Sequence, residues 1–234
     1  MAVNMKPDEA VQAINKVKRK LDLCNQNIRN AYLKYRGLKD DWTGGLYDEI
    51  ATQLNMEIGV FNDTFPDLTM QYEEAYKGVE WKNDHGNDSR KAELEPFINE
   101  AALTIPEIIF SNTTEIKHEL KALVEGKQRI HEQFQQAKNN CTLGINSAQE
   151  IAAGWKDAAG QAFAESVETT LKNFSDKMVR CDEIVGQAMD RVIAMAEEDE
   201  KRDKDLLRKQ EERKAKMERA LADLDNEINI LKNS

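Results

Sequence analysis

This chain of 234 residues has few residues that interrupt helices, with only 4 prolines and 11 glycines. Proline removes a backbone donor and glycine weakens a helix, so their scarcity permits long helical segments. No segment alternates polar and apolar residues for long enough to predict a β-strand. Charged residues make up 32% of the chain and apolar residues 40%. We therefore expect an all-α protein.

Long apolar runs are also missing. No run of about eighteen apolar residues, the length that a membrane-spanning helix needs, occurs in the chain. The segment from Met1 to Pro7 lacks the apolar core of a general secretory signal peptide. The net charge is −10 and no basic cluster interrupts the mixture of signs, which disfavours nucleic acid and anionic membrane surfaces as partners. We expect no integral membrane span and no nucleic acid partner.

Residues that carry catalysis are sparse and poorly arranged. His131 and Glu132 begin like a zinc-protease helix, but Gln135 stands where the second histidine ligand is needed. Glu115 and His118 have the spacing used in di-iron bundles, which need that motif twice. No glycine-rich phosphate loop and no serine elbow is present. We expect a protein that is not an enzyme and that holds no cofactor or metal.

What the chain does contain is an apolar pattern spaced alternately by four and three residues, the period of a coiled coil. It runs from Val17 to Val79 and again from Ile130 to Val192. Shifting the chain by 113 residues superimposes 16 of its 17 positions, and only Gly144 departs from the match. Internal repeats set an architecture before local motifs do. We therefore predict two copies of one helical unit.

A tryptophan and a glycine-containing break lie near the middle of each copy. The first break is Trp42 followed by Gly44 and Gly45, and the second is Trp155 followed by Gly160. Glycine allows a helix to end and the chain to reverse. Each tryptophan would bury about 200 Å² beside its reversal and lock the two arms together. The pattern predicts two antiparallel helical hairpins.

These features divide the chain into a first hairpin, a connector, a second hairpin and a tail, at residues 1–81, 82–112, 113–197 and 198–234. In the connector, Ser89 or Asp88 could cap a short helix that ends near Leu103. We expect the apolar cluster that follows to pack against the helices; it consists of Ile105, Ile108, Ile109 and Phe110. Asn112 and Glu115 have the spacing of a capping box, which predicts that the next helix begins there.

The tail reads as a charged helix with an apolar stripe near its end. Oppositely charged residues four apart, such as Glu198 and Arg202, support a solvated helix. Four-three spacing returns in the stripe, which consists of Met217, Leu221, Leu224, Ile228 and Leu231. The stripe could fold back on its own chain, pair with a second copy as a coiled-coil extension, or dock another protein.

The three cysteines occupy core positions of the heptad pattern; they are Cys24, Cys141 and Cys181. Their number is odd and their spacing is not that of a metal site. We interpret them as small buried hydrophobic residues. The count gives no indication of an oxidising compartment.

Trp42-Thr43-Gly44 between two amphipathic helices resembles the Trp-x-Gly superfamily, the early-secreted-antigen-like hairpin proteins exported by type VII secretion systems of Gram-positive bacteria and mycobacteria. The segment from Trp155 to Phe163 is similar to the same signature, although Asp157 stands where the family has glycine. The resemblance covers roughly residues 6–81 and 115–196. Members of this family usually pair as dimers. The resemblance therefore implies that a tandem copy forms a four-helix bundle within one chain.

Substrates in this family often carry a Tyr-x-x-x-Asp/Glu export signal just after the second helix of one partner. Tyr76 and Glu80 fit this pattern near the end of the first hairpin, although Tyr76 could equally be an aromatic residue flanking the core. The resemblance implies a secreted substrate, or a helical partner that targets a larger secreted effector. Its partners would be the secretion ATPase or that effector. Its location would be outside the cell without a general secretory signal peptide, or cytoplasmic before export.

A different class of function is also open on the same residues. A cytosolic coiled-coil scaffold or adaptor that is never exported would have the same composition and period. Its binding element would be the tail. Secretion distinguishes the two hypotheses, because only the first requires the protein to leave the cell.

Overall fold

The computed structural model describes residues 7–85, 104–113, 116–156 and 158–232, with side chains described except at 7–10, 64–69, 71–76, 78–85, 159, 227 and 230–232. Of the described residues 89% are helical, which confirms the predicted helical class. The elements are α1 (Pro7–Gly37), the 3₁₀ turn η1 (Leu38–Asp40), β1 (Trp42–Thr43), α2 (Gly45–His85), β2 (Lys117–His118), α4 (Leu120–Gly154) and α5 (Ala158–Lys232). The chain divides into two compact units, Met1–Met189 and Asp190–Ser234.

The first reversal occurs where the glycines predicted it. Helix α1 ends at Gly37, η1 and β1 follow, and α2 begins at Gly45. Trp42 is 2% exposed at this turn, so its predicted burial is confirmed. Gly44 has a φ of 110°, a conformation that residues with a side chain rarely adopt. The glycine therefore meets a backbone requirement.

The second reversal is shorter. Helix α4 ends at Gly154 and α5 begins at Ala158, and Trp155 between them is 4% exposed. Its burial also agrees with the prediction. Asp157, where the family pattern has glycine, lies outside the described residues.

Two short strands were not foreseen. Strands β1 and β2 pair antiparallel, with Trp42 opposite His118 and Thr43 opposite Lys117. The pairing continues as the Glu119 N–H donates to the Asp41 carbonyl at 3.0 Å. A ladder of two residues is too short for a period-two pattern, which explains why the sequence showed no strand.

The predicted start of the following helix is wrong. The capping box placed it at Asn112, but α4 begins at Leu120 after its cap residue Glu119. Asn112 instead has a positive φ of 50°, and Lys117 and His118 are extended in β2. Pairing with β1 holds them in that conformation.

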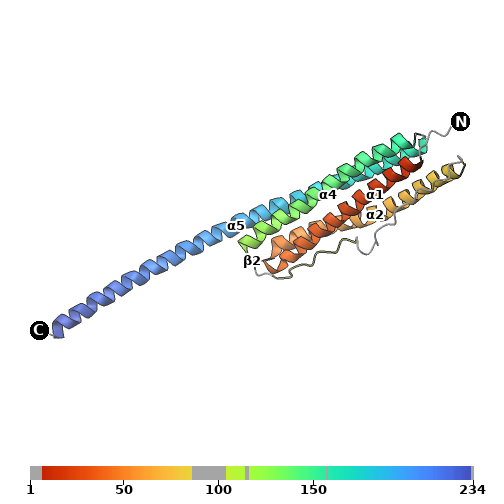
Figure 1. Cartoon of the computed structure of the whole chain (residues 1–234). Coiled ribbons are helices and arrows are strands. Elements are labelled where there is room, and N and C mark those ends of the chain that lie inside the picture. Colours follow the sequence, from red (N-terminus) through yellow and green to blue (C-terminus); the bar gives the residue numbers. More distant parts are fainter. Residues whose placement is uncertain (1–6, 86–103, 114–115, 157, 233–234) are drawn as a thin grey trace. The chain divides into compact units, whose positions relative to one another are not determined.

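Helices α1 and α4 pack side by side along their length (Figure 1). Lys16 Nζ lies 2.6 Å from a carboxylate oxygen of Glu150, and the Sγ atoms of Cys24 and Cys141 lie 3.2 Å apart. The partner number in α4 falls as the residue number in α1 rises, so the two helices are antiparallel. The first and second hairpins therefore contact each other within the first unit.

Helix α2 contacts both α1 and α5. The hydroxyl of Tyr32 on α1 donates to the Leu54 carbonyl at 2.9 Å. The rings of Phe61 on α2 and Phe174 on α5 meet edge to face with centroids 5.0 Å apart. These four residues are all buried, with at most 3% of each exposed. The second arm of the first hairpin is thus held between a helix of its own hairpin and one of the other.

Helix α5 also contacts α4. His131 Nδ1 lies 2.8 Å from a carboxylate oxygen of Asp182, and Gly144 on α4 faces the side chain of Leu171 on α5. The order of these contacts is again antiparallel. The three cysteines lie in the core of the first unit and are buried, as predicted.

Candidate functional site

The first tryptophan turn is built around three aromatic rings. Trp42 meets Tyr35 and Tyr47 edge to face at centroid distances of 5.9 and 5.5 Å, and the two tyrosines stack at 5.1 Å. The Tyr35 hydroxyl donates to the Tyr47 carbonyl at 3.0 Å. Burial raises the pKa of Tyr35 well above its usual value and that of Tyr47 to about 12. This uncharged aromatic cluster joins the end of α1 to the start of α2.

The second tryptophan turn depends on a small residue instead. A Cβ atom at Gly160 would overlap the ring of Trp155 and its carbonyl oxygen. The Trp155 N–H donates to the Ile151 carbonyl at 2.8 Å, which continues α4 into the turn. Gly160 therefore lets α5 pass close beneath the indole. The sequence prediction that this pair marks the turn is consistent with that arrangement.

A row of polar side chains on α2 holds residues 105–111, in the described part of the connector, in an extended conformation. Asn55 Nδ2 donates to the Ile108 carbonyl at 3.0 Å, and the Ile108 N–H donates to Asn55 Oδ1 at 2.8 Å. Asn62 forms the same pair of bonds with Ile105, at 3.4 and 3.0 Å. Each side-chain amide thus satisfies both backbone groups of one residue, as a neighbouring strand would.

Asp48 completes this row. Its two carboxylate oxygens accept from the Ser111 N–H at 2.6 Å and from the Ser111 hydroxyl at 2.9 Å. We call Asp48, Asn55 and Asn62 the polar ladder. They are seven residues apart on α2, about 10.5 Å per step, while the residues that they bind are three apart, about 10 Å in extended chain. The two spacings match, so successive residues of the polar ladder meet every third residue of the connector.

The ladder was missed at the level of sequence. The heptad spacing of Asp48, Asn55 and Asn62 is visible in the chain. Polar residues at that spacing are ordinarily a solvated helix face, and nothing in the sequence indicates that an extended segment lies against them. The polar ladder positions the connector beside α2. The tryptophan turn is joined to β2 separately, by the pairing of β1 with β2.

The predicted apolar cluster of the connector is only half buried. Ile105 and Ile108 are each 2% exposed, in agreement with the prediction. Ile109 and Phe110 are 46% and 37% exposed, so the prediction was wrong for these two. Burial recurs at every third residue of this extended segment, as in a polyproline II helix, so Ile109 and Phe110 between two inward positions face away from the helices.

The proposed export signal falls on α2. Tyr76 and Glu80 lie in the helix, which continues to His85, and their side chains are outside the described residues. The pattern thus lies on the last turns of the helix rather than beyond its end. Lys77 between them is exposed.

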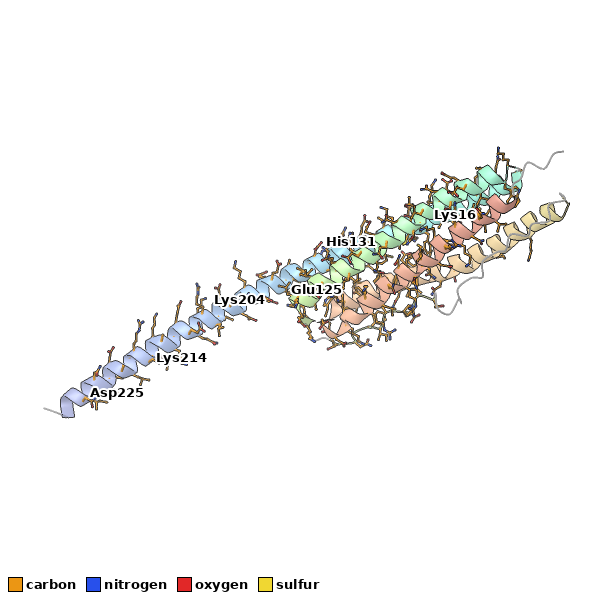
Figure 2. All side chains as sticks on the ribbon, viewed as in Figure 1. Lys16, Glu125, His131, Lys204, Lys214 and Asp225 are labelled. Carbon is orange, nitrogen blue, oxygen red and sulfur yellow. The ribbon has the colours of Figure 1, made fainter. Side chains whose placement is uncertain are left out.

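The tail stripe is exposed along α5 in the second unit. Met217, Leu221, Leu224 and Ile228 are 67%, 59%, 53% and 44% exposed, and the side chain of Leu231 is outside the described residues. Ion pairs within the helix support it, among them Arg202 with Glu198 at 3.4 Å and Lys204 with Glu200 at 3.3 Å. Figure 2 shows the charged side chains Lys204, Lys214 and Asp225 projecting from this part of α5. The stripe is a run of large apolar side chains in water.

Comparison of this chain with family models, with curated proteins and with solved structures gives no significant match. Among the described residues, no helix combines the length and apolar character that crossing a membrane requires.

Proposed function

We propose that this chain is a non-enzymatic helical-hairpin protein of a type VII secretion pathway, either a secreted substrate or a helical partner that targets a larger effector. The observation that carries the proposal is the repeated turn. In both copies the chain reverses beside a tryptophan that is at most 4% exposed. The Trp-x-Gly hairpins that the sequence resembles are defined by such a turn.

The arrangement we propose for the first unit is a four-helix bundle. Contacts join α1 to α2, α1 to α4, α4 to α5 and α2 to α5, and neighbours in that series are antiparallel. Such a series closes on itself, as helices around one core do. The bundle would be the counterpart, within one chain, of the paired hairpins of the family.

The secretion hypothesis is tested by the pattern at the end of α2. We expect Tyr76→Ala and Glu80→Ala each to remove most of the protein from the culture supernatant while cellular levels stay normal. Lys77→Ala, at an exposed position between them, is the matched control and should be exported as the native chain is. Unchanged export of both variants, or no export of the native chain, would contradict the proposal.

The alternative, a cytosolic coiled-coil scaffold, is favoured by the exposed stripe. In the heptad, Leu221 and Ile228 take a positions and Met217 and Leu224 take d positions. A parallel pair of tails would bring Arg213 close to the partner's Glu218, an attractive contact. An antiparallel pair would place Glu218 near the partner's Asp225, which repels. The charges therefore favour a parallel pair of two copies.

This second proposal is tested by the mass of the full chain in solution. We expect a dimer in sedimentation equilibrium at micromolar concentration, and a monomer after Leu221→Asp with Leu224→Asp. Leu143→Asp, at a residue of α4 that is 45% exposed, is the control and should leave the mass unchanged. A monomeric native chain would overturn self-pairing and leave the stripe to another protein.

A further inference from the structure

Two of the three buried thiols meet at the contact between the hairpins. The Sγ atoms of Cys24 on α1 and Cys141 on α4 lie 3.2 Å apart, and the side chains are 0% and 1% exposed. Met178 of α5 approaches Cys24 from another direction, with a sulfur to sulfur distance of 3.8 Å. Cys24 and Cys141 are 117 residues apart in sequence, so the fold alone brings them together.

We propose that Cys24 and Cys141 form a disulfide bond that joins the first hairpin to the second. The oxidant would be a low-molecular-weight disulfide of the glutathione class. One cysteine thiolate attacks that disulfide and releases one small thiol, and the second cysteine then attacks the mixed disulfide and releases the other. The two cysteines lose two protons and two electrons, and the oxidant becomes two thiols.

The helix backbones near the pair approach closely, as a disulfide between helices requires. Gly144 lies one turn after Cys141, and a Cβ atom placed on it would be 3.7 Å from the Cβ atom of Lys20, one turn before Cys24. A side chain at Gly144 would also press on Leu171 at 3.1 Å. The glycine that breaks the sequence repeat therefore keeps α4 close to α1 beside the two sulfurs.

The third cysteine is held apart from this pair. Cys181 lies beside Tyr32 of α1 instead, and burial raises the pKa of the Cys181 thiol to about 12. The sulfur nearest to Cys24 from α5 is the thioether of Met178, which cannot form a disulfide. The geometry thus selects one cross-link among the three that three cysteines allow.

Burial of the Cys24 thiol affects when the disulfide can form. It raises the pKa of the Cys24 thiol, so little of the attacking thiolate exists in the folded chain. We expect the disulfide to form while the chain folds, or when the contact between α1 and α4 opens. In the folded protein with that contact intact, it should form slowly. The thiols are therefore best tested by refolding.

The experiment refolds the reduced full chain in a mixture of reduced and oxidised glutathione and then counts free thiols in denaturant. The chain has 3 cysteines, and we expect one free thiol in the native sequence. Cys181→Ala should retain none, whereas Cys24→Ala and Cys141→Ala should each retain two. Peptide mass mapping without reductant should find Cys24 linked to Cys141. Three free thiols, a link that includes Cys181, or glutathione adducts alone would each overturn the proposal.

Thermal unfolding provides the second measurement. Closing a loop of this length should raise the melting temperature of the refolded chain by roughly 10 °C over its reduced form. Cys181→Ala should show the same rise, and it keeps the test valid if Cys24→Ala or Cys141→Ala fails to fold. Equal melting temperatures for the oxidised and reduced forms would contradict the cross-link. Because purified protein is used, the result is independent of whether the chain is secreted.

Discussion

The two hairpins share a core period and a buried tryptophan at the turn, but they differ on the faces turned away from that core. In the first hairpin α2 carries Asp48, Asn55 and Asn62, which bind the connector. The positions 113 residues later are Gln161, Glu168 and Ser175, and Glu168 pairs with Lys172 of its own helix at 2.5 Å. A repeated core thus tolerates divergent outer faces, because packing constrains only the positions that face inward.

The largest effect should come from truncating the tryptophans. We expect Trp155→Ala to lower the free energy of unfolding by about 3 to 5 kcal/mol through the lost burial and the cavity that remains. Trp42→Ala should lower it by about 1 kcal/mol more, because Trp42 also loses two edge-to-face ring contacts. Denaturant unfolding followed by circular dichroism measures both.

Met56→Ala is the control for this pair, since Met56 is 73% exposed and its truncation should change the free energy by less than about 0.5 kcal/mol. A melting temperature unchanged by Trp155→Ala would mean that the second turn does not rest on its tryptophan. The comparison of the two turns would then fail.

The next effect concerns how the second turn closes. Gly160→Ala should lower the free energy of unfolding by about 3 kcal/mol, because the added Cβ meets the indole and carbonyl of Trp155 and the backbone cannot easily move. Gly186→Ala on the same helix adds its Cβ to open space and should raise stability by about 0.5 to 1 kcal/mol. Chemical denaturation of the two variants should therefore give opposite signs. Equal signs would argue against close packing at Trp155.

A smaller difference in stability should distinguish substitutions on the outer faces of the two hairpins. Asn55→Ala leaves the Ile108 N–H and carbonyl without their side-chain partner and should cost about 2 kcal/mol. Glu168→Ala removes only an exposed pair within one helix, worth about 0.5 kcal/mol or less. Hydrogen exchange at the Ile108 amide should also accelerate in the first variant alone. Unchanged exchange there would show that the ladder does not protect the connector.

The helices, the two reversals and the buried tryptophans were predictable because each depends on local periodicity and on glycine. The cysteines were predicted to be buried for the same reason. The connector was less predictable. Its buried positions, Ile105 and Ile108, are three residues apart, so the apolar residues that follow directly do not turn inward, and Phe110 is 37% exposed.

Contacts between segments distant in sequence could not be predicted from the heptad period. The start of α4 at Leu120 depends on β2 pairing with β1, which no local pattern of two residues can encode. The approach of Cys24 to Cys141 depends on which helices of the two hairpins meet, and the heptad period is compatible with several pairings. The sequence therefore indicates which residues are buried better than which residues meet.

The smallest effect distinguishes two reasons for glycine in the first turn. Gly44 has a φ of 110°, so Gly44→Ala should lower the free energy of unfolding by about 1 to 2 kcal/mol through backbone strain. Gly45 begins α2 with open space at its Cβ position, so Gly45→Ala should be neutral or slightly stabilising. Denaturant unfolding of both variants compares adjacent glycines in one turn. If both substitutions are neutral, the first turn would be held by its aromatic cluster and β-pairing alone, and its glycine would differ in kind from Gly160, which is required by lack of space.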